Sequence, residues 1–320
     1  MHDRSYGDGH AHGGTPGDAA LLLLADSRLP AGGHAHSGGA EEAVRLGTIT
    51  GPEDLARFLR GRLATTGLVA AALAAAACEL AATARPPGGG EGEQPQRRGR
   101  GHLVQTRPGE DADDADDAED PAEPWRRLDA EADARTASPA QRQAARTQGR
   151  LLLRTARRMW PSPVLDALAA AVPEGPHHPI ALGAAAASAG CEPYQAALAA
   201  AYSSVTGPAT AAVRLLGLDP VTVHRLLADL APALNDAAHA ACASLMDAVV
   251  MDAGVVDTAL GDTGRGEADA GDPFTADPLG PDFPAGPRGS GWPALPGHAA
   301  PMLDLLAEGH LKNAMKLFVS

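Results

Sequence analysis

Histidine is the residue type in this sequence whose spacing most directly suggests chemistry. Two His-x-His pairs lie near the start of the chain, His10 with His12 and His34 with His36, and His2 precedes them. Imidazole binds divalent transition metals such as nickel, and a flexible His-x-His segment is suited to that role. The alternative is that these side chains only form a polar surface. We therefore assign no metal site and retain four candidate ligands: His10, His12, His34 and His36.

A glycine-rich turn at residues 29–42 joins two predicted helices. Pro30 disfavours the helical conformation for the residue before it, so the first helix, predicted over 19–25, ends there. Gly32 and Gly33 allow the backbone to adopt positive φ or to approach another backbone closely. On its own, this pattern indicates a helix-loop-helix.

A short helix is predicted over residues 40–47, directly after this turn. Ser37 is placed to cap it through its hydroxyl, although Ala40 stands where a capping box would have an acidic residue. Glu41 and Glu42 fall in the first turn, where the helix dipole favours negative charge. The pattern alone therefore predicts local roles for these polar side chains.

An arginine-rich helix is a second candidate interaction site. Ser138 and Pro139 form a helix start, with serine as the cap and proline at the first helical position. Arg142, Arg146 and Arg150 follow at intervals of four residues and therefore share one face. That face can bind an acidic partner or the chain's own carboxylates, and the acidic composition favours the second possibility.

The segment 301–320 combines a short predicted helix with two large apolar residues near its end, Leu317 and Phe318. A Gly- and Pro-rich stretch precedes it, so we expect this segment to stay mobile until a partner supplies an apolar groove. The alternative is that the segment folds back onto the core of its own chain.

Motifs of the common enzyme classes are absent from the sequence. It has no phosphate-binding P-loop, no dinucleotide-binding glycine motif after a strand, no His-Glu-x-x-His and no Gly-x-Ser-x-Gly. We predict that the protein is not an enzyme. A helical metal-dependent enzyme that uses buried histidines is the alternative.

The composition predicts helices as the elements that position these residues. Hydrophobic residues make up 44% of the 320 residues but aromatic residues only 3%, so alanine and leucine must fill the core. Such cores favour closely packed helices, because strands prefer β-branched and aromatic side chains. We predict an all-α fold, a single helical-bundle domain over residues 18–320.

Three low-complexity segments carry too little apolar surface to fold and are predicted to be disordered. The first is a His- and Gly-rich tail at residues 1–17. Two insertions interrupt the helical domain: residues 86–123, which end in an acidic run, and residues 261–299, which are rich in Gly, Pro and Asp. We expect the helical domain to tolerate both.

Charge and cysteine usage limit the classes of partner and compartment. A net charge of −14 argues against nucleic acid or an anionic membrane as the main partner. The widely spaced Cys78, Cys191 and Cys242 are typical of a reducing compartment. The apolar run at 67–77 is too short to span a bilayer, and the first residues lack a signal-peptide layout. We expect a cytoplasmic protein.

Several segments of this sequence resemble one protein family. The run Leu-Pro-x-Gly-Gly-x-x-x-Ser-x-Gly-x-Glu, from Leu29 to Glu41, resembles the N-terminal signature of the urease accessory protein UreF family. Residues 142–153 are similar to the arginine-rich helix of that family, residues 178–205 to its paired alanine-rich helices, and residues 301–320 to its C-terminal segment.

The resemblance implies an all-helical, non-enzymatic assembly factor. Proteins of this family act as dimers that bridge a UreD/UreH-type scaffold protein and the GTPase UreG, and they help to deliver nickel to apo-urease. Nickel is then handled by the complex, and no cofactor is bound tightly. The resemblance assigns partner-binding roles to Leu29, Pro30, Gly32, Gly33, Ser37, Glu41, Arg142, Arg146, His310, Lys316, Leu317 and Phe318.

The sequence also departs from the family pattern in two places. His34 and His36 stand where the family usually has aromatic residues, and Gly309, Leu311 and Lys316 alter the C-terminal segment. Lysine lacks the bidentate fork of arginine, so this segment is expected to dock differently. The alternative function is a direct nickel-binding or storage protein that acts through its N-terminal histidines.

Overall fold

The computed structural model describes residues 16–26, 29–30, 35–84, 120–252 and 292–320. All regular structure within these ranges is helical, which confirms the all-α prediction. Most of each segment predicted to be disordered lies outside the described residues. For those residues, disorder stays a prediction.

The helices follow one another through the described chain with short connections. Those before the gap at residues 85–119 are α1 (Pro16–Ala25), α2 (Ala40–Arg45), α3 (Pro52–Arg62), a π-helical turn (Leu63–Gly67) and α4 (Leu68–Thr83). The middle of the chain forms α5 (Glu123–Ala134), α6 (Pro139–Met159), α7 (Pro163–Ala171), α8 (His178–Ser188), α9 (Pro193–Leu216), α10 (Pro220–Asp229) and α11 (Ala231–Asp252). A 3-10 turn (Trp292–Ala294) and α12 (Pro301–Lys312) come last.

The edges of the predicted disordered segments are corrected by the structure. Helix α1 begins at Pro16, and residues 120–122 lead into α5, which begins at Glu123. Near the second insertion the chain is already fixed at Trp292, because Leu295 is buried and Arg135 donates to the carbonyl oxygens of Trp292 and Leu295 at 2.9 and 3.1 Å. Apolar anchors within a Gly- and Pro-rich stretch thus order part of it.

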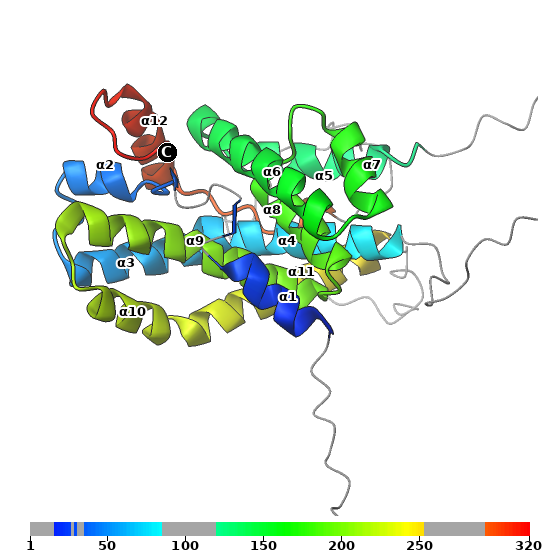
Figure 1. Ribbon diagram of the computed structural model, residues 1–320, viewed down its shortest axis with the longest axis horizontal. Helices are drawn as coiled ribbons and strands as arrows, with labels where there is room; N and C mark the ends of the chain where they lie inside the picture. Colours follow the sequence, from blue (N-terminus) through cyan, green and yellow to red (C-terminus); the bar gives the residue numbers. More distant parts are fainter. Residues whose placement is uncertain (1–15, 27–28, 31–34, 85–119, 253–291) are drawn as a thin grey trace, which may run out of the picture.

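Helix α4 is the centre of the fold and packs against α8, α9 and α11, as Figure 1 shows. Small residues let these helices approach closely. At Gly183 of α8, an added Cβ would lie 2.2 Å from the carbonyl oxygen of Ala74 in α4. The alanine-rich composition therefore produces the close helix packing that was predicted from it.

The helical run Pro52–Thr83 is long and apolar enough, by length and composition alone, to cross a membrane. The apolar run at residues 67–77 lies inside this longer helical run, because α3 and α4 continue into each other through the π-helical turn. However, 61% of its most apolar window is buried within the fold. That burial is typical of the core helix of a globular protein.

The two serine caps predicted from the sequence have different outcomes in the structure. Ser138 caps α6 as predicted, because its hydroxyl accepts from the backbone N–H of Gln141 at 3.2 Å. Ser37 does not cap α2, so that prediction is wrong. Gly39, with φ of 91°, precedes α2 instead, and the Ser37 hydroxyl is buried without a hydrogen-bond partner among the described residues.

Helix α9 runs without interruption through Pro208, although proline favours the first position of a helix over its interior. Proline has no N–H, so the carbonyl of Ser204, four residues earlier, loses its helical partner. The Nε of Arg62 replaces it and donates to Ser204 O at 2.7 Å. Arg62 of α3 thus supplies the missing donor to a helix 142 residues away in sequence.

Candidate functional site

The segment that follows α12 is bound to the start of α2 through the carboxylate of Glu41. Both oxygens of this buried carboxylate accept backbone hydrogen bonds, from Leu317 N at 2.6 Å and from Phe318 N at 3.1 Å. The expectation that the segment stays mobile is therefore wrong, and the alternative, folding back onto the chain's own core, is correct. Phe318 is 7% exposed and belongs to the core.

Backbone pairing extends this attachment over the last residues. Val319 N donates to Ala35 O at 2.7 Å, and Ser37 N donates to Ser320 O. The Nδ1 of His36 lies 2.5 Å from the hydroxyl oxygen of Ser320. We call this set of contacts between residues 35–41 and 317–320 the clasp.

His310 of α12 contacts both sides of the clasp. Its imidazole is buried, with Nε2 3.2 Å from Phe318 O and Nδ1 3.5 Å from the Glu41 carboxylate. The neighbouring Gly309 packs closely against α2, since an added Cβ would lie 2.6 Å from an oxygen of Glu42 and would displace that side chain. This departure from the family pattern therefore lets α12 lie against α2.

The outer side of the same segment presents apolar side chains to solvent. Residues alternate in an extended chain, so when Phe318 points inward its neighbours point outward. Met315, Leu317 and Val319 are all exposed, Leu317 at 76%. We call these three residues the apolar edge. Its position beside α2 and α12 at one end of the molecule is visible in Figure 1.

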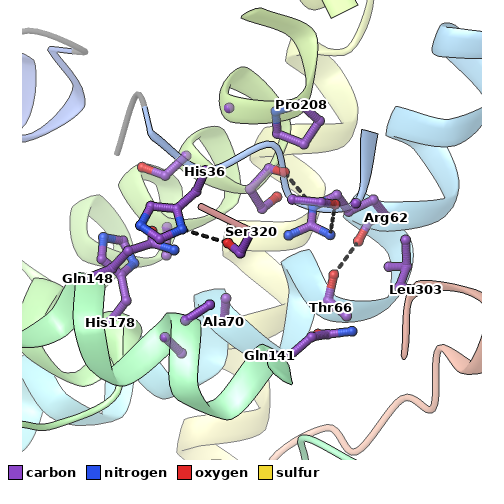
Figure 2. A pocket seen from close by; sticks show the side chains of 18 of the residues that line it. His36, Arg62, Thr66, Ala70, Gln141, Gln148, His178, Pro208, Leu303 and Ser320 are labelled. Carbon is purple, nitrogen blue, oxygen red and sulfur yellow. Dashed lines mark hydrogen bonds between the residues drawn. The ribbon is translucent and has the colours of Figure 1, made fainter. Parts of the chain in front are cut away.

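A cavity of about 840 Å³ lies behind the clasp, and Phe318 and Ser320 are among its lining residues. Arg62 lines it too and donates from Nη1 to Gly38 O at 2.9 Å, which holds the loop before α2. Burial lowers the pKa of Arg62 to about 10, so the side chain is still charged at neutral pH. Figure 2 shows the hydrogen bond of His36 to Ser320 inside this cavity.

His178, the first residue of α8, faces the same cavity beside His36 (Figure 2). Burial, and secondarily the charge of His36, lowers the pKa of His178 to about 4. Its imidazole is therefore neutral at physiological pH in the folded protein.

We expect stability to fall on acidification because of His178. Between its ordinary pKa near 6.5 and its folded pKa near 4, the unfolded chain binds the extra proton and the folded chain does not. The free energy of unfolding should drop by up to about 3 kcal/mol as pH falls through this window. Urea unfolding at several pH values should show a shallower dependence for His178→Gln than for wild type, whereas His224→Gln, on the exposed surface of α10, should leave the slope unchanged.

A second polar cluster joins α5, α6 and the turn before α8. The carboxylate of Asp129 accepts from His177 N at 2.9 Å and from Nδ1 of the same residue at 3.0 Å. Arg146 lies 2.8 Å from Asp129 and 2.5 Å from Asp133. Burial alone would raise the pKa of Asp129, but the hydrogen bonds from His177 and the charges around it lower the pKa overall.

The arginine-rich face of α6 is thus engaged with the chain's own acidic groups. Arg146 contacts two carboxylates, and Arg142 donates to Ala137 O at 3.0 Å and lies 3.8 Å from Asp133. Of the two possibilities left open by the sequence, self-pairing is the one observed. The prediction that Arg142 and Arg146 bind a partner is not tested by these contacts.

The structure brings together residues that lie far apart in the sequence. Ser37, Glu41, His310, Leu317 and Phe318 all meet at the clasp. Lys316 is exposed next to them, Leu29 is half-buried, and Pro30 is exposed with its carbonyl accepting from Thr155 at 3.0 Å. The candidate residues that lie outside the described residues are Gly32, Gly33, His10, His12 and His34.

Sequence reasoning missed Arg62, Asp129 and His177. No local motif marks any of them, because each is defined by a partner in another part of the chain. The Pro208 inside a long apolar pattern was the available signal for Arg62, since a proline within a helix leaves a carbonyl that needs a donor.

Comparison with known proteins gives one consistent match. The profile of the UreF family matches residues 49–231. A protein from Mycobacterium sp. (strain JLS), named urease accessory protein UreF, is 43% identical over 221 residues, which cover 69% of this chain and 83% of that protein. Proteins with the same name from Mycolicibacterium vanbaalenii and Mycobacterium tuberculosis (strain H37Rv) are 41% and 38% identical over 229 residues, or 72% of this chain and 87% of each relative.

Proposed function

This chain belongs to the UreF family of urease accessory proteins, and from that premise we propose how it acts in urease maturation. It serves as a non-enzymatic scaffold that links a UreD/UreH-type protein to the GTPase UreG while nickel is inserted into apo-urease. Nickel is cargo of the complex, and the chain holds no tightly bound cofactor. The protein works in the cytoplasm as a homodimer.

The apolar edge is the observation that supports a scaffold-binding role. Met315, Leu317 and Val319 are exposed on a segment whose backbone is already fixed by Glu41 and Phe318. A pre-ordered apolar segment binds with a smaller entropy cost than a mobile one. We propose that this edge contacts the UreD/UreH-type scaffold, while the clasp holds it in the binding conformation.

Replacing both Met315 and Leu317 with glutamine should weaken scaffold binding at least tenfold. Each buried side chain of this size contributes about 1.5–3 kcal/mol, and 1.4 kcal/mol corresponds to tenfold in affinity. Glutamine is neutral, so it does not repel the Glu41 carboxylate that binds this segment. Binding should be measured with purified scaffold protein, and the nickel content of urease should be measured after co-expression with all accessory proteins.

The matched control is Val221→Gln, because Val221 of α10 is 75% exposed and Leu317 76%. The control should bind the scaffold like wild type. Unchanged binding of the double variant, with a normal helical circular dichroism spectrum, would place the docking surface elsewhere on the molecule.

A further inference from the structure

His177 is a buried imidazole with a defined orientation and one unused nitrogen. It is 2% exposed, and its Nδ1 and backbone N both face Oδ1 of Asp129 at 3.0 and 2.9 Å. Because a carboxylate only accepts, Nδ1 carries the proton and donates it, so Nε2 of the neutral ring has a lone pair. A carboxylate that holds the far nitrogen of a histidine in this way is the usual outer partner of a metal-binding imidazole.

The Nε2 of His177 has no hydrogen-bond partner among the described residues although it is buried. It lies 3.2 Å from Oδ1 of Asp133 without hydrogen-bond geometry. Two ligand atoms that bind one ion at about 2.0–2.2 Å each stand roughly 3 Å apart. The spacing of this nitrogen and this oxygen therefore fits two ligands of one cation, and ligand atoms of His177, Asp133 and Asp129 all lie within 4.8 Å of one another.

We propose that Nε2 of His177 and Oδ1 of Asp133 bind a divalent transition-metal ion, with Asp129 orienting the imidazole. Asp133 is 41% exposed, so water reaches the site and completes the coordination. An imidazole with one carboxylate suits zinc, nickel or cobalt better than calcium or magnesium, which prefer oxygen ligands alone. Two protein ligands give a reversible site rather than a permanent structural one.

The acidic side chains around the site are paired with arginines. Three carboxylates, from Asp129, Asp133 and Glu174, surround Arg146, whose guanidinium lies 2.8, 2.5 and 3.7 Å from them. Arg142 is a second cation, with its Nε 3.8 Å from Oδ1 of Asp133. Arg150 also lies at Glu174 and donates from Nη1 to its carbonyl oxygen at 2.8 Å, so three arginines face three carboxylates. What a metal ion supplies here is a partner for Nε2 of His177, which has none among the described residues.

Equilibrium dialysis of the full chain against ZnCl2 tests this site, with His177→Asn and Asp133→Asn as the variants. Asparagine at position 177 retains an amide N–H that can donate to Asp129 but lacks the Nε2 ligand. Because the chain has twelve histidines, the quantity to compare is the difference in bound zinc between each variant and wild type. We expect each variant to bind one ion fewer per chain at a zinc concentration that saturates wild type. His224→Asn, on the exposed surface of α10, should bind as many ions as wild type.

A second measurement separates metal binding from a change in folding. Circular dichroism should show unchanged helix content for Asp133→Asn, whose side chain is partly exposed, even if His177→Asn is less stable. Addition of Co2+ to wild type should give visible absorption bands of a nitrogen- and oxygen-ligated ion, and Asp133→Asn should lose the fraction that belongs to this site. Wild-type zinc stoichiometry in a folded Asp133→Asn or His177→Asn variant would overturn the proposal.

Discussion

Replacing Phe318 with alanine is expected to lower the free energy of unfolding by about 3–5 kcal/mol, the usual cost of removing a buried phenylalanine. The side chain is 7% exposed and belongs to the core. Its loss also weakens the clasp, because the hydrogen bonds to Glu41 depend on the position of residues 317 and 318. Urea unfolding followed by circular dichroism measures the effect.

The adjacent residue provides the matched control. Leu317 is similar in size and hydrophobicity but 76% exposed, so Leu317→Ala should change the free energy of unfolding by less than about 0.5 kcal/mol. Equal losses for the two substitutions would mean that residues 317 and 318 do not alternate between solvent and core as described. The buried Phe318 is also the reason why removal of residues 301–320 would unfold part of the core and would be a poor test of partner binding.

Gly183→Ala should destabilise the protein by at least about 2 kcal/mol, although alanine is the better helix former. The added Cβ would lie 2.2 Å from Ala74 O and 2.9 Å from Cys78 N, which are backbone atoms of the central helix α4. Because backbone atoms cannot rotate away, α8 must move off α4, and overpacking of this kind costs about 1–3 kcal/mol or more. Thermal unfolding should show a clear decrease in the melting temperature.

Gly61→Ala is the control for this substitution, since Gly61 lies within α3 and an added Cβ would meet nothing within 4 Å. Here the helix propensity of alanine acts alone and should raise the free energy of unfolding by about 0.5–1 kcal/mol. If both substitutions stabilised the protein, the close approach of α8 to α4 would be incorrect.

The sequence predicts those parts of the fold that depend on local chemistry. A serine cap followed by proline located the start of α6, and the scarcity of aromatic residues predicted helices packed through alanine. Pro208 was misleading because its effect on α9 is cancelled by Arg62, a residue from another helix. Propensity describes a segment by itself and contains no information about such a distant donor.

The candidate site was only partly predictable for the same reason. Glu41 was placed in the first turn of a helix, where its charge suits the dipole, but its carboxylate binds backbone 276 residues away. The resemblance to a family singled out Glu41, His310 and Phe318 without showing that they touch. The pairing of His177 with Asp129 spans 48 residues and follows no spacing rule. Side chains that satisfy buried backbone or imidazole groups become apparent only once the helices are packed.

The π-helical turn at Leu63–Gly67 lies within the longest helical run of the described chain, Pro52–Thr83. It determines how the side chains of α4 are rotated about the helix axis relative to those of α3. A π turn contains one residue more than an α turn, which rotates everything after it by about 100°. Before the turn, α3 shows one apolar stripe that faces α9 and α10; after it, α4 is buried by α8, α9 and α11. The continuous run of α3 and α4 therefore turns its apolar side chains in one direction along α3 and in another direction along α4. The length of this short stretch, more than the identity of its residues, determines which side chains of α4 meet the core.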